Sequence, residues 1–325
     1  MYNVTKKHIC KVCTSTKKHK QFLVKEMMFG FRDEFTYFQC TDCGCLQIDE
    51  VPNKLNKYYP DNYYSFGKYN GKKFRGIVGR LNKLRYQHLW TGPKLIKAIL
   101  KLFSGNKFFI FNDLNIDKKT KILDVGCGGG KKFLYPLAEA GFINIKGCDP
   151  FLKNTIQYEN GLTIEKSSIF DLRGYWDIIT FHHSFEHVPN PLDFLNKVYE
   201  LLEPDGICII RIPTVSSYAW EHYGVNWVQL DAPRHLLLHS YKSIKLLGKK
   251  CKLKLFKCVY DSYHFQFTGS EKYIKNIPLR RSKNIGLVDF TKSKIQQKKY
   301  ERKAQNLNKE SRGDQAAFFF KKSLN

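Results

Sequence analysis

Short apolar segments alternate with amphipathic ones from about residue 119 onward, and this alternation limits the fold more than any other feature of the sequence. After Asn190 and Pro191, a capping residue and a first-turn proline, apolar side chains recur at helical spacing. Strands that alternate with helices form a mostly parallel sheet covered on both faces. The sequence therefore predicts an α/β fold. Strands are expected at 121–126, 143–149, 162–167, 176–181, 206–213, 252–260 and 314–322.

Composition and charge exclude several classes of protein. Of the 325 residues, 42% are hydrophobic, which is enough to build a core and rules out a wholly disordered chain. The net charge is +26, yet residues 120–240 hold ten basic and 14 acidic side chains, so the basic excess lies in the flanking segments. A chain built throughout to hold nucleic acid would not have an acidic centre.

The sequence also bears on where the protein works. No apolar run reaches the ~18–20 residues that a membrane span needs, and the N-terminal residues lack the apolar core of a secretory signal. We therefore expect a cytoplasmic protein with no transmembrane segment. In that reducing compartment, we expect its ten cysteines to bind metal rather than to form disulfides.

A glycine-rich loop, GCGGG at 126–130, follows the first predicted strand. Glycine lets the backbone come close to a ligand, and ligands of such sheets bind at the carboxyl ends of the strands. The dinucleotide fingerprint is GxGxxG, but here Lys131 occupies the position of its last glycine. The loop therefore predicts a ligand site that differs from that of a dehydrogenase.

Two carboxylates narrow the choice of ligand. Asp124 lies on the strand just before the loop, where it can meet an ammonium group but would repel a pyrophosphate. Asp149 ends the next strand, where it can accept both hydroxyl hydrogens of a ribose. A ligand with a ribose, a cationic amino-acid tail and no phosphate fits this pair. S-adenosylmethionine is such a ligand.

Together with 147–150 (GCDP), 176–195 and 201–213, this loop resembles the class I S-adenosylmethionine-dependent methyltransferases. The resemblance implies a Rossmann-like, mostly parallel sheet of seven strands with helices on both faces. It also implies that Asp124 and the loop glycines surround the methionine moiety, Asp149 holds the ribose, and Phe170 lies by the adenine. The cofactor-binding residues implied in this way are Asp124, Gly126, Gly128, Gly130, Asp149, Phe170 and His182.

Two CxxC pairs, separated by 26 residues, stand near the N-terminus. Four thiolates saturate zinc and leave no open coordination position, so the metal is expected to be structural. It would supply folding free energy that a module of about 50 residues lacks. His8 or Cys45 could replace one of the ligands. The expected ligands are Cys10, Cys13, Cys40 and Cys43.

We expect three segments along the chain. Residues 1–52 form a zinc-ribbon-like module, 53–110 form a Tyr-rich connector with basic helices, and 111–325 form the methyltransferase domain. This order, with the segment 231–247 (DAPRHLLLHSYKSIKLL), resembles a subgroup of methyltransferases that act in the assembly of surface glycans or on sugars. The basic stretch 280–312 is expected to be a mobile insertion or an exposed helix.

Histidines are the candidates for acid–base chemistry at the acceptor. Methyl transfer is an in-line displacement at a sulfonium, and a hydroxyl or carbon acceptor must lose a proton to a base. Imidazole suits this role at neutral pH. We expect His235 to be the base, with His182 or His187 beside it. The alternatives are histidines that only hydrogen-bond loops together, or a metal cluster of His182, His183, Glu186 and His187.

Two arginines near this region allow two interpretations. Arg211 and Arg234 could pair with an anionic acceptor such as a nucleotide diphosphate, because a guanidinium matches phosphate geometry. Equally, each could pair with a carboxylate of the chain itself.

The predicted function is transfer of a methyl group from S-adenosylmethionine to a sugar or glycan-type acceptor, nucleotide-linked, lipid-linked or polymeric, in polysaccharide biosynthesis. The basic flanks and the zinc module leave an RNA methyltransferase as an alternative. A further alternative is a non-catalytic scaffold that makes a peripheral membrane contact through the basic amphipathic stretch 93–103. The expected partner is a small-molecule or glycan acceptor, with nucleic acid as the weaker candidate.

Overall fold

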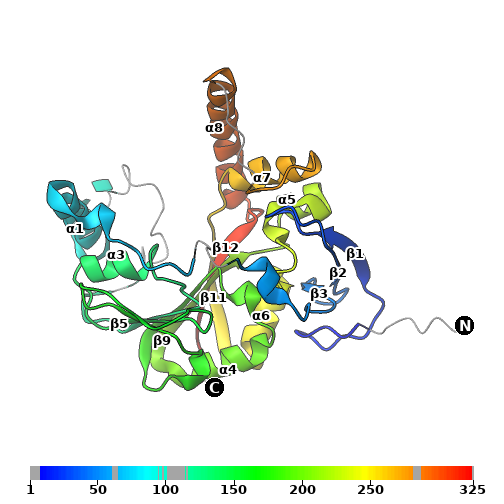
Figure 1. Cartoon of the computed structure of the whole chain (residues 1–325). Coiled ribbons are helices and arrows are strands. Elements are labelled where there is room, and N and C mark those ends of the chain that lie inside the picture. The colour runs from blue at the N-terminus through cyan, green and yellow to red at the C-terminus, as the bar shows by residue number, and fades with distance from the viewer. Residues whose placement is uncertain are drawn as a thin grey trace, which may run out of the picture. The chain divides into compact units, whose positions relative to one another are not determined.

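The structure is a computed structural model that describes residues 8–60, 65–93, 95–96, 99–100, 114, 116–280 and 287–323 (Figure 1). The chain divides into two compact units, and each is assembled from stretches that are separate in the sequence. The first unit comprises 1–60, 185–195 and 211–318, and the second comprises 61–184, 196–210 and 319–325. Much of the stretch 93–103 lies outside the described residues.

The main sheet has eight strands in the order β11-β12-β9-β8-β4-β5-β7-β6. Its pairs β4–β5, β4–β8 and β5–β7 are parallel, while β6 and β7 are antiparallel. The α/β fold and all seven expected strands are confirmed. The bounds are β4 (Ile122–Val125), β5 (Ile145–Cys148), β6 (Ile156–Gln157), β7 (Thr163–Glu165), β8 (Trp176–His182), β9 (Leu202–Pro213), β11 (Leu253–Tyr260) and β12 (Gln315–Lys322).

The expected total of seven strands is wrong by one, because a two-residue strand pairs at the sheet edge. Ile156 faces Ile164, and Gln157 faces Thr163. Two residues are too few to show the period-2 alternation by which a strand is recognised in a sequence. The added strand is antiparallel to its neighbour β7.

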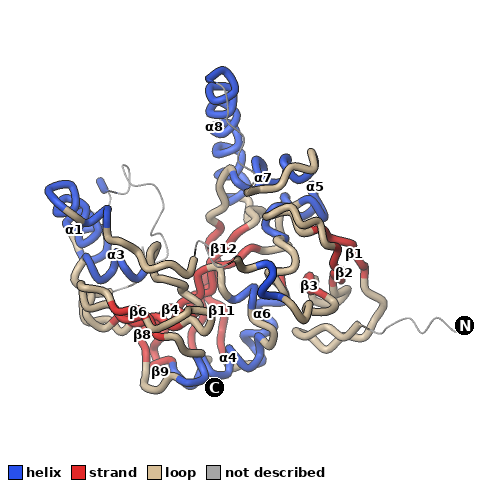
Figure 2. Tube along the Cα trace, in the orientation of Figure 1, coloured by secondary structure: helices blue, strands red, loops and turns tan. Residues whose placement is uncertain are grey.

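The second unit holds the strands β4 to β8 and their helices (Figure 2). Its core includes the fully buried Ile122, Leu134 and Ile164. The short helix that follows the glycine loop packs on both β5 and the first helix of the unit. The helices are α1 (Gly76–Thr91) and α3 (Leu134–Glu139), with the 3₁₀ helices η2 (Lys72–Phe74) and η4 (Ile169–Asp171).

The first unit is built on a separate four-stranded sheet with the order β1-β2-β3-β10. Three of its strands come from the cysteine-bearing N-terminal segment, and the fourth comes from residues almost 190 positions later. Strand β3 pairs antiparallel with β10, with Leu237 opposite Gln47. The strands are β1 (Lys20–Lys25), β2 (Glu34–Gln39), β3 (Leu46–Ile48) and β10 (Leu237–Leu238).

Apart from the 3₁₀ helix η1, the remaining helices lie after β8 in the chain, and the stretch 280–312 contains the long helix α8. Within the described residues, no helix is long and apolar enough to cross a membrane. The helices are α4 (Pro191–Leu201), α5 (Tyr218–Tyr223), α6 (Tyr241–Lys250), α7 (Phe265–Ile274) and α8 (Leu287–Lys309). The 3₁₀ helices are η1 (Leu55–Tyr58), η5 (Phe185–His187), η6 (Gly224–Asn226) and η7 (Val228–Leu230).

Candidate functional site

The glycine loop in the second unit is held between two neighbouring strand ends. The N–H of Gly126 donates to the carbonyl oxygen of Cys148 over 2.8 Å, at the end of β5. The N–H of Gly128 donates to Oδ2 of Asp149 over 2.8 Å, and the N–H of Phe151 donates to Oδ1 of the same carboxylate over 2.9 Å. Asp149 therefore lies at the loop, with its carboxylate held by two backbone N–H groups.

Glycine is required in this loop for two physical reasons. Gly126, Gly128 and Gly130 have φ values of 68°, 55° and 65°, a region that other residues rarely adopt. A Cβ on Gly128 would lie only 2.3 Å from the carbonyl oxygen of Ser65. That same oxygen accepts the N–H of Gly129 over 2.7 Å, so the segment around Ser65 passes directly against the loop. No feature of the sequence predicted this contact.

Asp124 is almost completely buried beneath the loop. Thr180, on the adjacent strand β8, donates its hydroxyl hydrogen to Oδ1 of Asp124 over 2.8 Å. Burial, with a smaller contribution from the negative charge of Asp149, raises the pKa of Asp124 to about 8, against the effect of the Thr180 hydrogen bond. A cationic ligand at this position would favour the charged carboxylate again.

Aromatic side chains stand beside this loop in the second unit. Phe151 follows Asp149 by two residues and is 70% exposed, while Phe170 is 42% exposed. The ring of Phe66 lies 6.4 Å from that of Phe151. His182 packs its ring 4.4 Å from Phe133. Phe151 was not among the expected cofactor residues, although its place just after Asp149 could have suggested it.

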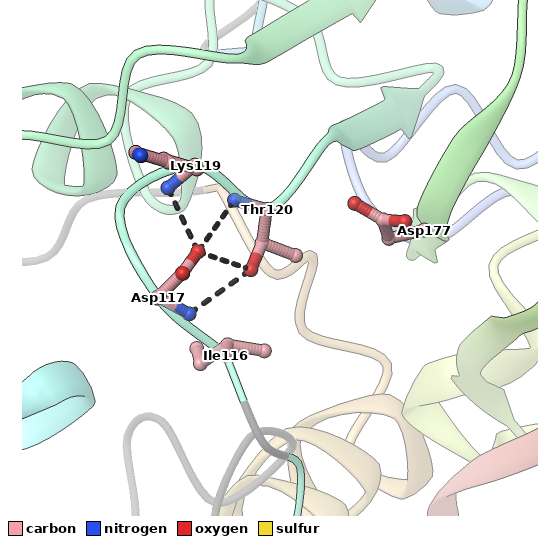
Figure 3. A pocket seen from close by; sticks show the side chains of 5 residues that line it. All are labelled: Ile116, Asp117, Lys119, Thr120 and Asp177. Atoms are coloured by element: carbon pink, nitrogen blue, oxygen red, sulfur yellow. Dashed lines mark hydrogen bonds between the residues drawn. The ribbon is translucent and has the colours of Figure 1, made fainter.

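A separate pocket in the second unit lies at the opposite end of the strands (Figure 3). It has a volume of about 250 Å³ and is lined by Ile116, Asp117, Lys119, Thr120 and Asp177. Asp117 and Thr120 hydrogen-bond to each other and to nearby backbone in a closed turn (Figure 3). Ligands of such sheets bind at the carboxyl ends of strands, so this amino-end pocket is not the candidate site.

A second cluster of reactive side chains lies in the first unit. Glu186 and His187 in η5 meet His235, and one ligand atom of each lies within 4.8 Å of the others. The two imidazole rings are 4.9 Å apart at an angle of 70°. Burial, and then the neighbouring His187, lower the pKa of His235 to about 4, so its ring is neutral at pH 7. Two of the three expected catalytic histidines are thus brought together.

A buried ion network supports the loop that carries His235. Arg234 is fully buried and contacts the carboxylates of Asp231 at 2.6 Å and Glu26 at 3.1 Å. Burial acts to raise the pKa of Asp231, but the charge and hydrogen bonds of Arg234 hold it below its ordinary value. Arg211 pairs with Asp261 at 2.6 Å. Both arginines therefore bind carboxylates of the chain, as the second interpretation of the sequence allowed.

The N-terminal sheet fixes the backbone on both sides of the histidine cluster. Tyr37 on β2 donates its hydroxyl hydrogen to the carbonyl oxygen of His235 over 2.8 Å. The N–H of Leu236 donates to the carbonyl oxygen of Glu186 over 2.8 Å, and the N–H of Ile48 donates to the carbonyl oxygen of Leu236 over 3.0 Å. The cysteine-bearing segment is therefore part of the frame that positions these side chains.

The four expected cysteine ligands gather into one cluster in the first unit. The Sγ atoms of Cys10 and Cys43 are 3.5 Å apart, and those of Cys13 and Cys40 are 3.4 Å apart. Each CxxC pair is followed by a residue in the left-handed conformation, at Thr14 and Gly44. In each pair, that residue donates its N–H to the carbonyl oxygen of the first cysteine over 2.8 Å. The two halves thus repeat one local geometry.

Neither alternative ligand belongs to this cluster within the described residues. Nδ1 of His8 lies 2.9 Å from a carboxylate oxygen of Asp49, and Cys45 is buried outside the group. The expected histidine-rich group also differs from the one observed. His182 and His183 are not members of it, and His235 joins Glu186 and His187 instead. No spacing rule could show that a residue 48 positions later completes the group.

This arrangement of sheet, glycine loop and carboxylates defines the class of S-adenosylmethionine-dependent methyltransferases. A family model described as a methyltransferase domain matches residues 91–255, which is just over half of the chain. The chain belongs to this methyltransferase domain family. The expectation of an enzyme that uses S-adenosylmethionine is confirmed.

Curated relatives share one name, "Ubiquinone biosynthesis O-methyltransferase". The protein from Haemophilus ducreyi is 37% identical over 210 residues, covering 58% of this chain and 88% of the relative. The protein from Rickettsia felis is 31% identical over 168 residues, covering 47% of this chain and 61% of the relative. The protein from Actinobacillus pleuropneumoniae serotype 7 is 29% identical over 176 residues, covering 48% and 74%.

These names correct the predicted function. The expected sugar or glycan acceptor and a role in polysaccharide biosynthesis are wrong, because the relatives are named for ubiquinone biosynthesis. The physical reason is that the motifs in the sequence bind the cofactor, which is common to methyltransferases with many acceptors. The alternative of a non-catalytic scaffold is wrong as well, and the comparisons give no support to an RNA acceptor.

Solved structures of similar fold include a SAM-dependent methyltransferase from Thermotoga maritima, 16% identical with a TM-score of 0.42, covering 76% of this chain and 96% of that one. Another is a SAM dependent methyltransferase from Archaeoglobus fulgidus, 18% identical with a TM-score of 0.40, covering 74% and 99%.

Proposed function

We propose that the chain is an O-methyltransferase that moves the methyl group of S-adenosylmethionine to a hydroxyl of a small molecule related to ubiquinone precursors. The observation that carries this proposal is the 37% identity that extends over 88% of the Haemophilus ducreyi O-methyltransferase. In the reaction, the acceptor oxygen attacks the methyl carbon and the bond from this carbon to sulfur breaks. Sulfur keeps the electron pair, and the hydroxyl proton passes to a base.

The cofactor is assigned to the glycine loop of the second unit. Asp124 binds the ammonium group, since a buried carboxylate with a raised pKa gains most from a cation. Asp149 accepts the ribose hydroxyl hydrogens, an assignment that its position against the glycine loop supports. Phe170 and Phe151, whose rings are accessible, are assigned to the adenine. Gly126, Gly128 and Gly130 let the methionine part approach the backbone.

The proton of the acceptor is assigned to the histidines of the first unit. Nδ1 of His235 lies 2.7 Å from the carbonyl oxygen of Gln229, and Nδ1 of His187 lies 2.7 Å from that of Arg234. A carbonyl oxygen can only accept a hydrogen, so in each ring Nδ1 carries the hydrogen and Nε2 carries the lone pair. Both rings can therefore receive a proton or a cation at Nε2. The third catalytic candidate, His182, packs against Phe133 and borders the cofactor in this proposal.

The four cysteines are assigned to a structural zinc ion. With Zn–S bonds of about 2.3 Å, a tetrahedral site needs sulfur atoms about 3.8 Å apart. The shortest separations here, 3.4 Å and 3.5 Å, are close to that value. Bound zinc would stabilise the small N-terminal segment and, through β3, the loop that carries His235.

The test of this function uses methyl-labelled S-adenosylmethionine with separate acceptors. We expect the labelled methyl group on phenols, including hydroxylated ubiquinone precursors, and none on amines of similar size. The Asp124→Asn variant is the matched control, because it should fold but lose transfer. Transfer to amines alone, or no transfer to any hydroxyl acceptor in the presence of metal ions, would contradict the proposal.

A further inference from the structure

Glu186, His187 and His235 bring a carboxylate and two imidazoles together in the first unit, with one ligand atom of each within 4.8 Å of the others. We propose that these residues bind one divalent transition-metal ion, in addition to the zinc assigned to the cysteines. Two histidines with one carboxylate form a common ligand set for zinc and related ions. The ligands come from η5 and from the loop before β10.

The hydrogen bonds of both histidines prepare them for a metal. Their Nδ1 atoms face the carbonyl oxygens of Gln229 and Arg234, which fixes the tautomer and leaves the lone pair on Nε2. Histidine ligands of metals almost always donate their other ring N–H to such a carbonyl or to a carboxylate.

The charges around His235 also favour a cation. Its Nε2 lies 3.8 Å from Oε1 of Glu186 and 3.8 Å from Oδ2 of Asp231. These distances are too long for hydrogen bonds, and a lone pair facing carboxylate oxygens is repelled. Nitrogen and oxygen ligands at about 2.0–2.2 Å from one ion lie roughly 3–4 Å apart, so a metal fits between His235 and Glu186. Asp231 is engaged by Arg234 and adds negative charge beside the ion.

The frame around the three ligands is rigid. Tyr37 holds the carbonyl of His235, and the N–H of Leu236 holds the carbonyl of Glu186. Glu186 is fully buried and His235 nearly so, whereas His187 is half-buried. An ion would therefore meet preformed ligands and reach solvent on the side of His187.

Three protein ligands leave at least one coordination position open, which distinguishes this site from the closed set of four cysteines. A divalent ion lowers the pKa of a hydroxyl that binds to it. This role, which rests on the proposed O-methylation, suits a hydroxyl compound as the acceptor. With an ion on their Nε2 atoms, His187 and His235 cannot also take the hydroxyl proton, which then leaves to solvent, so the ion replaces these histidines as the group that activates the hydroxyl.

The test titrates the full chain, with zinc already in the cysteine cluster, with Co²⁺ alone. We expect one Co²⁺ per chain, with visible bands typical of nitrogen and oxygen ligands and no thiolate charge-transfer band. His187→Ala and Glu186→Gln should each weaken Co²⁺ binding at least about tenfold. His222→Ala removes an exposed imidazole of α5 and should leave binding unchanged. If Glu186→Gln does not fold, His187→Ala alone tests the metal site. The side chain of His187 is only half-buried, so its removal should leave the fold intact.

The absence of a Co²⁺ complex in the wild-type chain, or equal affinity in the wild type and His187→Ala, would overturn the metal site. Such a result together with methyl transfer to hydroxyl acceptors would leave the proposed function intact. Co²⁺ binding lost in both variants, without methyl transfer to any hydroxyl, would keep the metal site and remove the proposed function.

Discussion

The cofactor loop and the histidine cluster are built in opposite ways. The loop takes its groups from adjacent strands of one sheet, with Asp124 on β4 and Asp149 just after β5. The histidine cluster joins η5 to a loop almost 50 residues later and is fixed by the N-terminal sheet. A site made from strand ends follows from fold class alone, whereas a site made from remote segments depends on each of its supports. Substitutions that damage those supports should therefore impair the histidine cluster and leave the glycine loop intact.

The largest effect is expected from Cys40→Ser. Structural zinc sites contribute about 10–16 kcal/mol of apparent binding free energy, so loss of one ligand should release the metal and disorder the cysteine-bearing sheet. Because β3 of this sheet pairs with β10, Co²⁺ binding at the histidine cluster should be lost as well. Elemental analysis and Co²⁺ titration check this. The matched control is Cys258→Ser, outside the cluster. Full zinc content in Cys40→Ser would contradict the assignment.

Arg234→Met should have the next largest effect. It leaves the carboxylates of Glu26 and Asp231 without their buried cation, so the free energy of unfolding should fall by about 3–5 kcal/mol. Arg312→Met breaks an exposed pair with Glu221 and should cost about 0–1 kcal/mol. Urea denaturation measures both. Equal stability of the two variants would mean that the network does not support the histidine loop.

Asp124→Asn tests the glycine loop rather than the histidine cluster. Removing the charged partner of the ammonium group should weaken S-adenosylmethionine binding by about 2–3 kcal/mol, which is roughly 30-fold to 150-fold. Co²⁺ binding should not change. Asp177→Asn, at the amino end of the sheet, is the matched control and should bind the cofactor normally. Calorimetry measures each affinity, and an unchanged affinity in Asp124→Asn would remove the proposed contact.

The smallest effect concerns pH. In the free protein the pKa of Asp124 is raised to about 8, so its carboxyl group is mostly protonated at pH 6 and must lose a proton to bind the ammonium group. Affinity for S-adenosylmethionine should therefore rise about tenfold, or 1.4 kcal/mol, from pH 6 to pH 7. Calorimetry at both pH values, with Asp124→Asn as the control without this dependence, measures it. An affinity that falls as the pH rises would contradict this prediction.

The sequence by itself determined the α/β class, all but one of the strands of the main sheet, the glycine loop and the cysteine set. Each depends on local spacing: strand period, loop chemistry and CxxC pairs. The acceptor could not be predicted, since the glycine loop and Asp124 are the residues that we assign to a cofactor that many methyltransferases share. Only the tertiary structure joined His235 to Glu186 and His187 and paired β10 with β3. Such contacts depend on how distant segments pack against each other, and the periodicity within either segment carries no information about that packing.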